Sequence, residues 1–250
     1  MEGSEMVLMS LESLNLLDSA MRLPVIIRRL SEEKVSAIAV VGDVPPDAIP
    51  IADKYQTPLL SIPPGTRLQR VEKAIISLIV DQRAELERRG VQIYRQLAQL
   101  EIEDKGLRAI LGALAQITGK TVALQNERFD LEIYTGGENL VPDKDMAQAS
   151  LRDNDEEVRR WLRGSPLMST SPPITRVKLP LEGMARFVAP VVIRGAVAGY
   201  ISVIGKEGEL NEIDQVATGR GASVCAIEMA KQRAIIEAEN RMRGDFVEEL

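Results

Sequence analysis

The sequence contains no histidine and a single cysteine, Cys225, among its 250 residues. The absence of histidine excludes Ser-His-Asp and Cys-His catalysis and histidine-ligated metal or haem sites. One cysteine excludes an internal disulfide and a cysteine-rich zinc site. Cys225 lies in the apolar helical pattern GASVCAIEMA. We therefore expect it to be a small buried hydrophobic residue, not a redox group or a chromophore attachment point.

Aromatic residues are also scarce, at 3% of the chain, so the core must consist mainly of Leu, Ile, Val, Ala and Met. No apolar run approaches the roughly 20 residues of a membrane span, and no secretion signal is evident. The formal net charge of −6 disfavours a broad basic face for nucleic acid. These features predict a cytoplasmic protein without membrane contact.

Three short apolar runs in the first third of the chain predict strands, at 6–10, 35–42 and 58–64. We expect the second and third to be buried. The segments between them read as helices, because PVIIRRLSEEK places Pro24 in a first turn and PPDAIPIADKYQ supports a short helix. Strands that alternate with helices predict a small α/β unit with parallel strands.

A long helical pattern follows from Arg67, with apolar residues at spacings of three, four and seven and charged residues between them. Such a helix can pack on the surface of its own domain. Alternatively, it can connect two domains and also pair with a second copy of the chain. Its length and its position between two domains favour the connector.

The second half predicts a helix that ends at Gly119, two strands joined by a turn at Glu127–Arg128, and an irregular region at 136–173 with one short helix, NDEEVRRWLRG. A strand at 174–181 and a hairpin around Arg194–Gly195 follow, and then one long final helix. Asn211 is the expected N-cap, with Asp214 completing an approximate capping box. This order predicts an antiparallel α+β sheet with helices on one side.

The amino-terminal segments VIIRRLSEEKVSAIAVVG and IPIADKYQTPLLSIPPGTRLQRVEKAI resemble the amino-terminal domain of PucR-type bacterial transcription regulators. The segment FVAPVVIRGAVAGYISVIGKEGELNEIDQVATGRGASVCAIEMA resembles the carboxy-terminal part of a GAF domain. The closing AENRMRGDFVEEL is similar to the linker that precedes the helix-turn-helix domain of these regulators. Together the three resemblances cover nearly the whole chain.

The resemblance implies four parts. Residues 1–88 form a PucR-like α/β domain that starts later than the family pattern, so we expect it to be incomplete. Residues 89–104 form a helical connector, 105–235 a GAF-like sensor domain, and 236–250 a linker helix toward an effector domain missing from this chain. The fold class is thus α/β plus α+β: a small parallel unit, a long connecting helix, and a GAF-like antiparallel sheet with flanking helices.

A GAF-like domain implies a small-molecule pocket between the sheet and its variable loops, largely apolar with a few polar groups. Candidate lining residues are Tyr134, Trp161, Arg176, Lys178, Arg186, Tyr200 and Ser202. The basic residues among them favour an anionic ligand. Trp161, the only tryptophan, either anchors its short helix on the sheet or covers the pocket. Many GAF domains instead serve as dimerisation modules without a ligand, and this alternative stays open.

The final helix carries apolar residues at mixed spacings of three and four: Val224, Ile227, Ala234, Ile235, Ala238, Met242 and Phe246. This spacing, with Ala at several positions, predicts a weak coiled-coil seam. We therefore predict a homodimer through the middle and end helices. A weak seam suits a helix that changes its packing to carry a signal between domains.

No enzyme constellation is recognisable. GGEN at 136–139 shares only its first three letters with the diguanylate cyclase signature and is predicted to be a turn. GRGAS at 219–223 lacks the Lys-Ser/Thr of a P-loop and falls within a helical pattern, where its glycines favour close packing. We expect no enzyme activity, no metal and no cofactor.

The resemblance implies the sensory and dimerising region of a regulator. A small-molecule effector or a partner acts on the GAF-like domain, and the end helix relays the change to a DNA-binding domain beyond Leu250. DNA is then bound only through that domain. A GAF input module of a phosphatase, kinase or cyclase is the main alternative. A free-standing enzyme is a third, which the absence of histidine disfavours.

Overall fold

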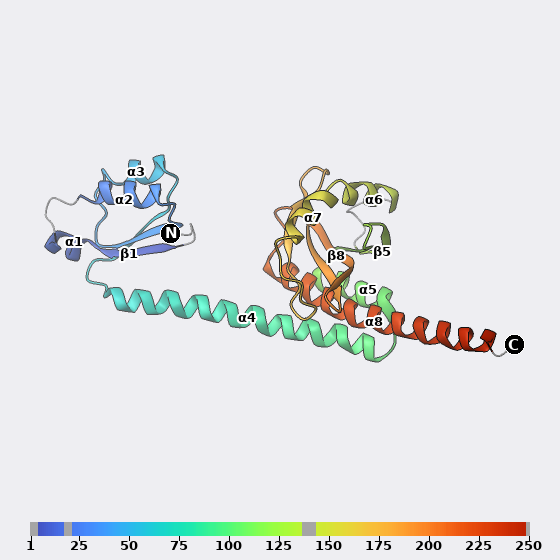
Figure 1. Cartoon of the computed structure of the whole chain (residues 1–250). Coiled ribbons are helices and arrows are strands. Elements are labelled where there is room, and N and C mark those ends of the chain that lie inside the picture. The colour runs from blue at the N-terminus through green and yellow to red at the C-terminus, as the bar shows by residue number, and fades with distance from the viewer. Residues whose placement is uncertain (1–4, 18–21, 137–143, 249–250) are drawn as a thin grey trace. The chain divides into compact units, whose positions relative to one another are not determined.

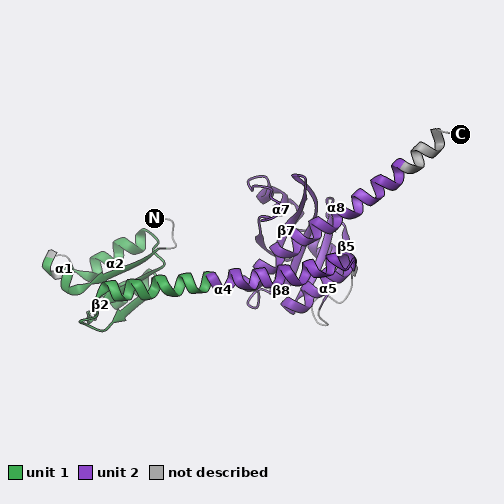
Figure 2. Ribbon diagram, turned by 90° about the horizontal axis from the view of Figure 1, so that it is seen from below, with its two compact units in different colours: residues 1–83 green, residues 84–250 purple. Residues whose placement is uncertain are grey.

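The computed structural model describes residues 5–17, 22–136 and 144–248. The chain divides into two compact units, Met1–Arg83 and Ala84–Leu250 (Figure 2). One helix, α4 (Leu68–Ile102), contains the boundary between them. Each unit is described by itself.

The first unit is a parallel three-stranded sheet in the order β1-β2-β3, made of β1 (Met6–Ser10), β2 (Ala37–Val41) and β3 (Leu59–Ile62). Its helices are α1 (Leu11–Leu17), α2 (Leu23–Glu32), α3 (Ile49–Lys54) and the first part of α4. Ile27 of α2 packs on Ile38 and Val40 of β2. The predicted parallel α/β unit is confirmed, and α1 is an additional element.

The prediction of a strand within 58–64 is confirmed, but the prediction that this strand is buried is wrong. Leu60 of β3 is 48% exposed and Ser61 is also exposed. β3 lies at the edge of the sheet, so its side chains are not enclosed by a strand on each side. The central strand β2 is buried from Ile38 to Val41, as predicted.

The second unit is built on a five-stranded antiparallel sheet in the order β5-β4-β8-β7-β6. Its strands are β4 (Thr121–Asn126), β5 (Leu131–Thr135), β6 (Thr175–Lys178), β7 (Met184–Ile193) and β8 (Ala196–Lys206). Its helices are α5 (Gly106–Thr118), α6 (Lys144–Arg152), α7 (Asp155–Leu162), α8 (Glu212–Glu248) and the second part of α4. The predicted strands, hairpin and long final helix are confirmed.

Helices cover both faces of this sheet, so the prediction of helices on one side is wrong. α5 and α8 lie on one face and α6 and α7 on the other (Figure 1). The cause is visible in β8, which buries Ile201 and Val203 on the α8 face and Tyr200 and Ile204 on the opposite face. A sheet that is apolar on both faces needs two covering layers.

α8 begins with the predicted capping box. The Asn211 side chain accepts hydrogen bonds from the backbone N–H groups of Ile213 (2.8 Å) and Asp214 (3.2 Å). Asp214 in turn accepts one from the backbone N–H of Asn211 at 3.0 Å. This reciprocal arrangement satisfies N–H groups that a helix start otherwise leaves unpaired.

Glycines let α8 approach its neighbours closely. A Cβ atom at Gly221 would lie 2.8 Å from Leu114 Cδ2 of α5 and 3.1 Å from Ile201 Cδ1 of β8. A Cβ at Gly90 of α4 would lie 2.9 Å from Val216 Cγ1 of α8. All three distances are shorter than ordinary carbon contacts. The prediction that the GRGAS glycines serve close helix packing is confirmed.

We predict that Gly221→Val lowers the free energy of unfolding of the second unit by about 1–3 kcal/mol, because the larger side chain overpacks the α5–α8 contact. Urea unfolding followed by the fluorescence of Trp161, which lies in this unit, measures the change. Gly112→Ala on α5 is the matched control, since its added Cβ meets nothing within 4 Å. It should raise stability by up to about 1 kcal/mol. A Gly221→Val variant as stable as the wild type would contradict the packing described.

Candidate functional site

Arg186 of β7 is a fully buried cation, with none of its surface exposed. Its Nη1 donates to Gln125 Oε1 at 3.0 Å and to Ser202 Oγ at 3.4 Å, and its Nη2 donates to the carbonyl oxygen of Leu151 at 3.2 Å. Nε has no hydrogen-bond partner among the described residues. Burial lowers the pKa of Arg186 to about 10, against the nearby charges of Asp155 and Glu157, so the group stays charged at neutral pH.

A buried guanidinium held by neutral acceptors is costly, because desolvation is only partly offset. Over the parts of the chain that the structure describes, no carboxylate lies within ion-pair distance of Arg186. Two of its partners are side chains of the central strands and the third is the end of α6. Arg186 therefore joins the sheet to the helices that cover this face.

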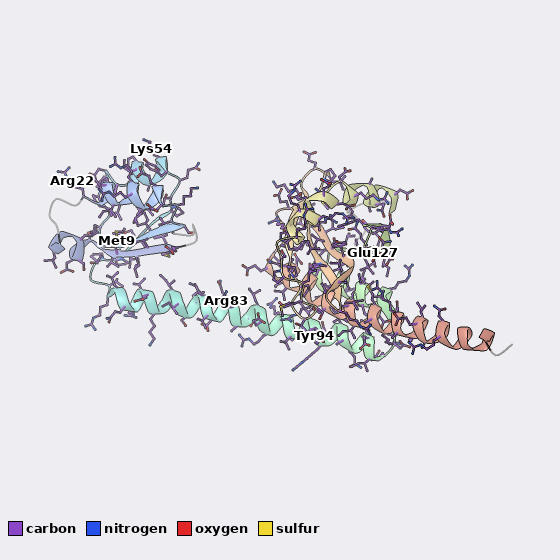
Figure 3. The ribbon with its side chains drawn as sticks, viewed as in Figure 1. Met9, Arg22, Lys54, Arg83, Tyr94 and Glu127 are labelled. Atoms are coloured by element: carbon purple, nitrogen blue, oxygen red, sulfur yellow. The ribbon has the colours of Figure 1, made fainter. Side chains whose placement is uncertain are left out.

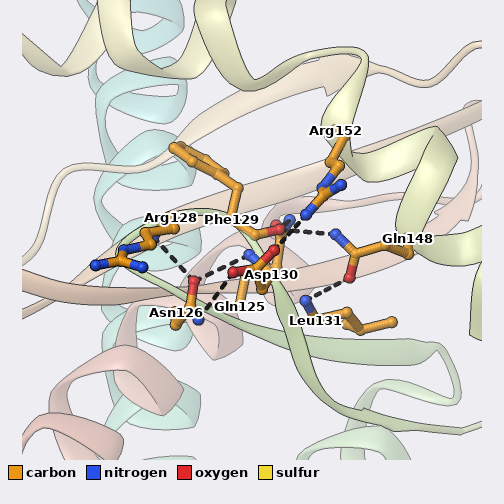
Figure 4. A network of polar contacts seen from close by, with 8 residues as sticks. All are labelled: Gln125, Asn126, Arg128, Phe129, Asp130, Leu131, Gln148 and Arg152. Atoms are coloured by element: carbon orange, nitrogen blue, oxygen red, sulfur yellow. Dashed lines mark hydrogen bonds and ion pairs between the residues drawn. The ribbon is translucent and has the colours of Figure 1, made fainter.

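A polar network on the β4–β5 hairpin extends this connection (Figure 4). Gln125 Nε2 and Gln148 Nε2 each donate to the carbonyl oxygen of Phe129 at 2.9 Å. The backbone N–H of Leu131 donates to Gln148 Oε1. Gln148 lies on α6, so the network ties the hairpin to that helix.

The hairpin turn is closed by its own side chains. Asn126 Oδ1 accepts from the backbone N–H groups of Arg128 (2.9 Å) and Asp130 (3.0 Å). Phe129 sits in the left-handed region with φ of 65°, a backbone conformation that costs energy for a bulky residue. Arg152 of α6 forms an ion pair with Asp130. The turn thereby holds Phe129 against the sheet.

Phe129 is the centre of a three-layer stack. Its ring lies 4.1 Å from the ring of Tyr200, with 15° between the planes. The guanidinium carbon of Arg159, on α7, lies 4.5 Å from the Phe129 centroid. A cation over an aromatic face contributes about 0.5–2 kcal/mol. Val158 and Trp161 of α7 pack in the same cluster, so α7 is held by stacking and apolar contact.

The junction between α6 and α7 faces Arg186 with unpaired acceptors. Asn154 Oδ1 and Asp155 Oδ1 are buried and have no hydrogen-bond partner among the described residues. Burial raises the pKa of Asp155 to about 6, and the charge of Arg186 is the largest opposing influence. A buried donor, Arg186 Nε, and buried acceptors therefore stand unused in one region. A small polar molecule, or ordered water, could satisfy them.

Five of the seven predicted ligand-binding residues lie on the α6–α7 face. Arg186 and Ser202 are in contact, and Tyr200 lies in the adjacent stack. Trp161 is half-buried beside that stack, and Tyr134 packs in a neighbouring cluster with Ala123 and Ile204. The structure thus brings together the core of the predicted set.

Arg176 and Lys178 are placed elsewhere. On β6 they flank Val177, which is buried toward α7, so strand alternation turns both basic residues to the opposite face. Arg176 lies 6.0 Å from the Phe187 centroid and donates to the carbonyl oxygen of Glu207. Lys178 forms an exposed ion pair with Glu207 at 3.0 Å. Neither contributes to the environment of Arg186.

Sequence reasoning missed Gln125, Phe129, Gln148 and Asp155. Gln125 left a usable signal, because it is a polar residue within the otherwise buried strand TVALQN. Phe129 and Asp155 fall at a turn and a helix start, where their direction depends on local backbone geometry. Gln148 lies on α6, within the region 136–173 where the sequence predicts no helix other than NDEEVRRWLRG.

The residues predicted for the dimer helix differ in exposure. Val224 is fully buried in the core of its own unit and is unavailable to a second copy. Ile227 is 45% and Ile235 50% exposed, and Ala238 is exposed. Met242 lies in α8, but its side chain is outside the described residues.

Two sequence motifs can be placed. Cys225 is fully buried, and burial raises the pKa of its thiol to about 12, so the prediction of a small buried hydrophobic residue is confirmed. Of GGEN, only Gly136 is described, with φ of 125°, and the remaining three residues lie outside the described residues.

Among the helices that the structure describes, none is long and apolar enough to cross a membrane.

No family model matches the chain. The chain is 21% identical over 242 residues to the purine catabolism regulatory protein of Bacillus subtilis (strain 168), an alignment that covers 93% of this chain and 41% of that protein. The chain therefore spans less than half the length of this curated relative, to which it is similar over nearly all of its own length.

Solved structures show looser similarity. An IclR homolog from Microbacterium sp. strain HM58-2 matches 85% of this chain and 98% of its own, with 13% identity and a TM-score of 0.33. The match to a domain of a putative IclR-family transcriptional regulator covers 58% of this chain and 94% of that domain, with 13% identity and a TM-score of 0.31. The match to MglB in a tetrameric arrangement covers 50% of this chain and 91% of the MglB chain, with 9% identity and a TM-score of 0.36. These scores are too low to define a shared fold.

We predict that Asp155→Asn stabilises the second unit at pH 7.5 and has little effect at pH 4. The pKa of about 6 in the folded state exceeds the value of about 3.9 in an unfolded chain. The stability linked to this proton is complete below the lower pKa and is lost as pH rises through the higher one. The variant should gain about 1 kcal/mol at pH 7.5, a figure reduced for solvent screening.

Urea unfolding at the two pH values, followed by Trp161 fluorescence, measures this difference. Asp153→Asn, an exposed neighbour, serves as the control and should change little at either pH. An Asp155→Asn effect of equal size at pH 4 and 7.5 would show that the carboxyl does not titrate as described.

Proposed function

We propose that this chain is the sensory and dimerising region of a PucR-type transcription regulator, with a GAF-like domain at residues 105–235. The observation that carries the proposal is the dual environment of α8. Its first part is buried against the sheet through Ala217, Ala222 and Cys225. Its residues from 232 to 241 are all exposed. Similarity to the purine catabolism regulatory protein over 93% of the chain supports the same proposal.

The proposed relay runs through two strands. Arg186 lies on β7 and Ser202 on β8, and both strands also carry the residues on which α8 packs, including Ala189 and Ile201. A change on the α6–α7 face that moves either strand therefore alters the support of α8. A continuous helix passes such a change along its length. DNA binding then belongs to a domain outside this chain.

The proposed effector is a small molecule that occupies the region of Arg186. Displacing the α6–α7 junction would free Arg186 from the Leu151 carbonyl and expose Nε and both terminal nitrogens to a ligand acceptor. A guanidinium recognises carboxylates and similar planar acceptors through paired hydrogen bonds. An acceptor-bearing metabolite fits this donor set. The unpaired oxygens of Asn154 and Asp155 favour one that also carries an N–H or O–H donor.

In the proposed domain organisation, residues 1–88 form a PucR-like domain, 89–104 a connector and 236–250 a linker helix. Ile93 and Leu97 of the connector are buried in the second unit. The connector therefore also forms part of the packing of the sensor. A non-enzymatic, cytoplasmic role remains part of this proposal.

A GAF input module of a phosphatase, kinase or cyclase is the alternative function. The sheet and its helices serve such a protein equally well. The coding sequence downstream of Leu250 separates the two, because a regulator requires a helix-turn-helix domain there.

A homodimer through α4 and α8 is proposed from their exposed apolar side chains. On α4 these are Ile76, Leu78, Ile79 and Val80, each more than half exposed. On α8, Ile235 is 50% and Ile236 56% exposed. Exposed apolar side chains gathered on a surface mark interaction sites, and the matching helix of a second copy would cover each of these two sets.

We predict that the wild-type chain is a dimer at micromolar concentration and that the double variant Ile235→Glu, Ile236→Glu weakens dimerisation at least about tenfold, because buried carboxylates oppose association. Light scattering measures the mass. Gln232→Glu with Asn240→Glu adds the same charge at exposed positions of the same helix that are not part of the predicted seam, and it tests whether charge alone is responsible. A monomeric wild type would contradict the proposal.

We predict that an effector from a panel of purine-derived metabolites and amino acids raises the melting temperature by mass action. Arg186→Lys should weaken binding of that effector at least about tenfold, because lysine cannot form the paired contact. Arg176→Lys is the matched control on the opposite face. In the full-length protein, the effector should change the affinity for promoter DNA in a gel-shift assay. An effector that binds both variants equally would remove Arg186 from the site.

A further inference from the structure

A cavity of about 520 Å³ lies within the second unit, apart from the Arg186 region. Tyr94 of α4, which is labelled in Figure 3, forms one wall. Ala226, Ile227 and Ala230 of α8 form another, and the end of β7 closes it at Val192. Neither Arg186 nor its hydrogen-bond partners Gln125, Ser202 and Leu151 are among the described residues that line this cavity. We call this cavity the α4–α8 groove.

The lining of the groove is mainly apolar. Its volume falls in the range of about 300–1,000 Å³ that holds small organic molecules. Ile227 is 45% exposed although it forms part of this concave wall. An apolar molecule bound there would remove it from water.

The polar groups of the groove are basic or carry hydroxyls. Arg194 and Arg220 both line it, together with Ser223, and no Asp or Glu is among the described residues that line it. Ser223 Oγ donates to carbonyl oxygens of its surroundings, Gly219 at 3.2 Å and Thr170 at 3.4 Å. Two guanidinium groups beside an apolar wall complement an anion with an apolar body.

Arg220 is available to such an anion. Its ion pair with Glu87 is long, at 3.5 Å, and the Glu87 side chain is 76% exposed. An exposed pair of this kind contributes little and exchanges readily. Space beside Arg220 depends on Gly90, where a Cβ atom would lie 3.4 Å from Arg220 Nε. A ligand carboxylate can therefore replace Glu87 as the partner of Arg220.

We propose that the α4–α8 groove binds a small organic acid, an aliphatic or aromatic body bearing one carboxylate. A second copy of the chain is a less suitable occupant. A symmetric copy presents the same patch, so Arg194 and Arg220 would meet equally basic surroundings. The acid instead neutralises both groups.

Occupation of the groove bears on the output helix directly. The lining residues on α8 extend from Arg220 to Ala230, and the exposed residues of α8 begin just beyond them. An acid held between Tyr94 and this part of α8 would fix the packing of α4 against α8. The groove is a second ligand site, distinct from the Arg186 region. The proposal that it binds an acid does not depend on whether the chain belongs to a regulator.

Isothermal titration of the whole chain with octanoate, phenylacetate and indole-3-acetate tests the proposal. At least one acid should bind with a Kd below about 1 mM. Octanamide has the same length as octanoate but no charge, so it should bind at least about tenfold more weakly than octanoate. Arg220→Gln and Arg194→Gln should each weaken binding of the acid at least about fivefold. Ala230→Trp, which fills the groove, should abolish it.

Arg233→Gln is the matched control, because it removes the same charge from α8 outside the groove and should leave the Kd unchanged. Circular dichroism establishes that each variant is folded. Failure of all three acids to bind would overturn the proposal. So would octanamide binding as tightly as octanoate, or acid binding that persists in Ala230→Trp and disappears in Arg186→Lys. Conversion of a dimer to a monomer by Ala230→Trp, without acid binding to the wild type, would assign the groove to a second copy.

Discussion

The second unit depends on one constraint: its central strand β8 is apolar on both faces. Ile201 and Val203 require cover on one side, and Tyr200 and Ile204 require it on the other. α5 and α8 supply the first layer through close packing at Gly221. α6 and α7 supply the second, where the Phe129 stack and the Gln148 contacts hold them. Each layer uses different chemistry, close apolar packing on one face and polar contacts with stacking on the other.

This division has a functional meaning within the proposed sensor. The α8 face contains no buried cation among its described core residues, and its glycines bring α8 into close contact with α4, α5 and β8. The α6–α7 face carries Arg186 together with Asn154 and Asp155, each of which has one buried side-chain oxygen without a partner among the described residues. Dense apolar packing resists change, whereas a partly satisfied polar network leaves alternatives close in energy. The proposed relay therefore begins at the Arg186 region on one face of the sheet and ends at α8 on the other.

Much of this arrangement is predictable from the sequence, and the remainder fails for identifiable reasons. Periodicity located the strands of both units and the long helices, and Asn211 with Asp214 marked the start of α8 correctly. Hydrophobic runs reveal that a segment is buried, but not by which neighbour. The predictions that helices cover only one face of the second sheet and that β3 is buried are wrong for this reason. Arg186, Tyr200 and Ser202 are candidates because the GAF-like resemblance implies a pocket beside these strands. Gln148 and Asp155 depend instead on how α6 and α7 lie over the sheet, which no local sequence pattern encodes.

The sealed position of Cys225 has a practical consequence. A thiol that is fully buried, with a pKa near 12, reacts slowly with alkylating reagents because its thiolate is rare and inaccessible. A cysteine introduced on the exposed surface of α8 would therefore be the only readily labelled thiol of the chain. In the proposed homodimer, one spin label on each copy at such a position, read by electron paramagnetic resonance, would report the separation of the two α8 helices, with the native cysteine left in place.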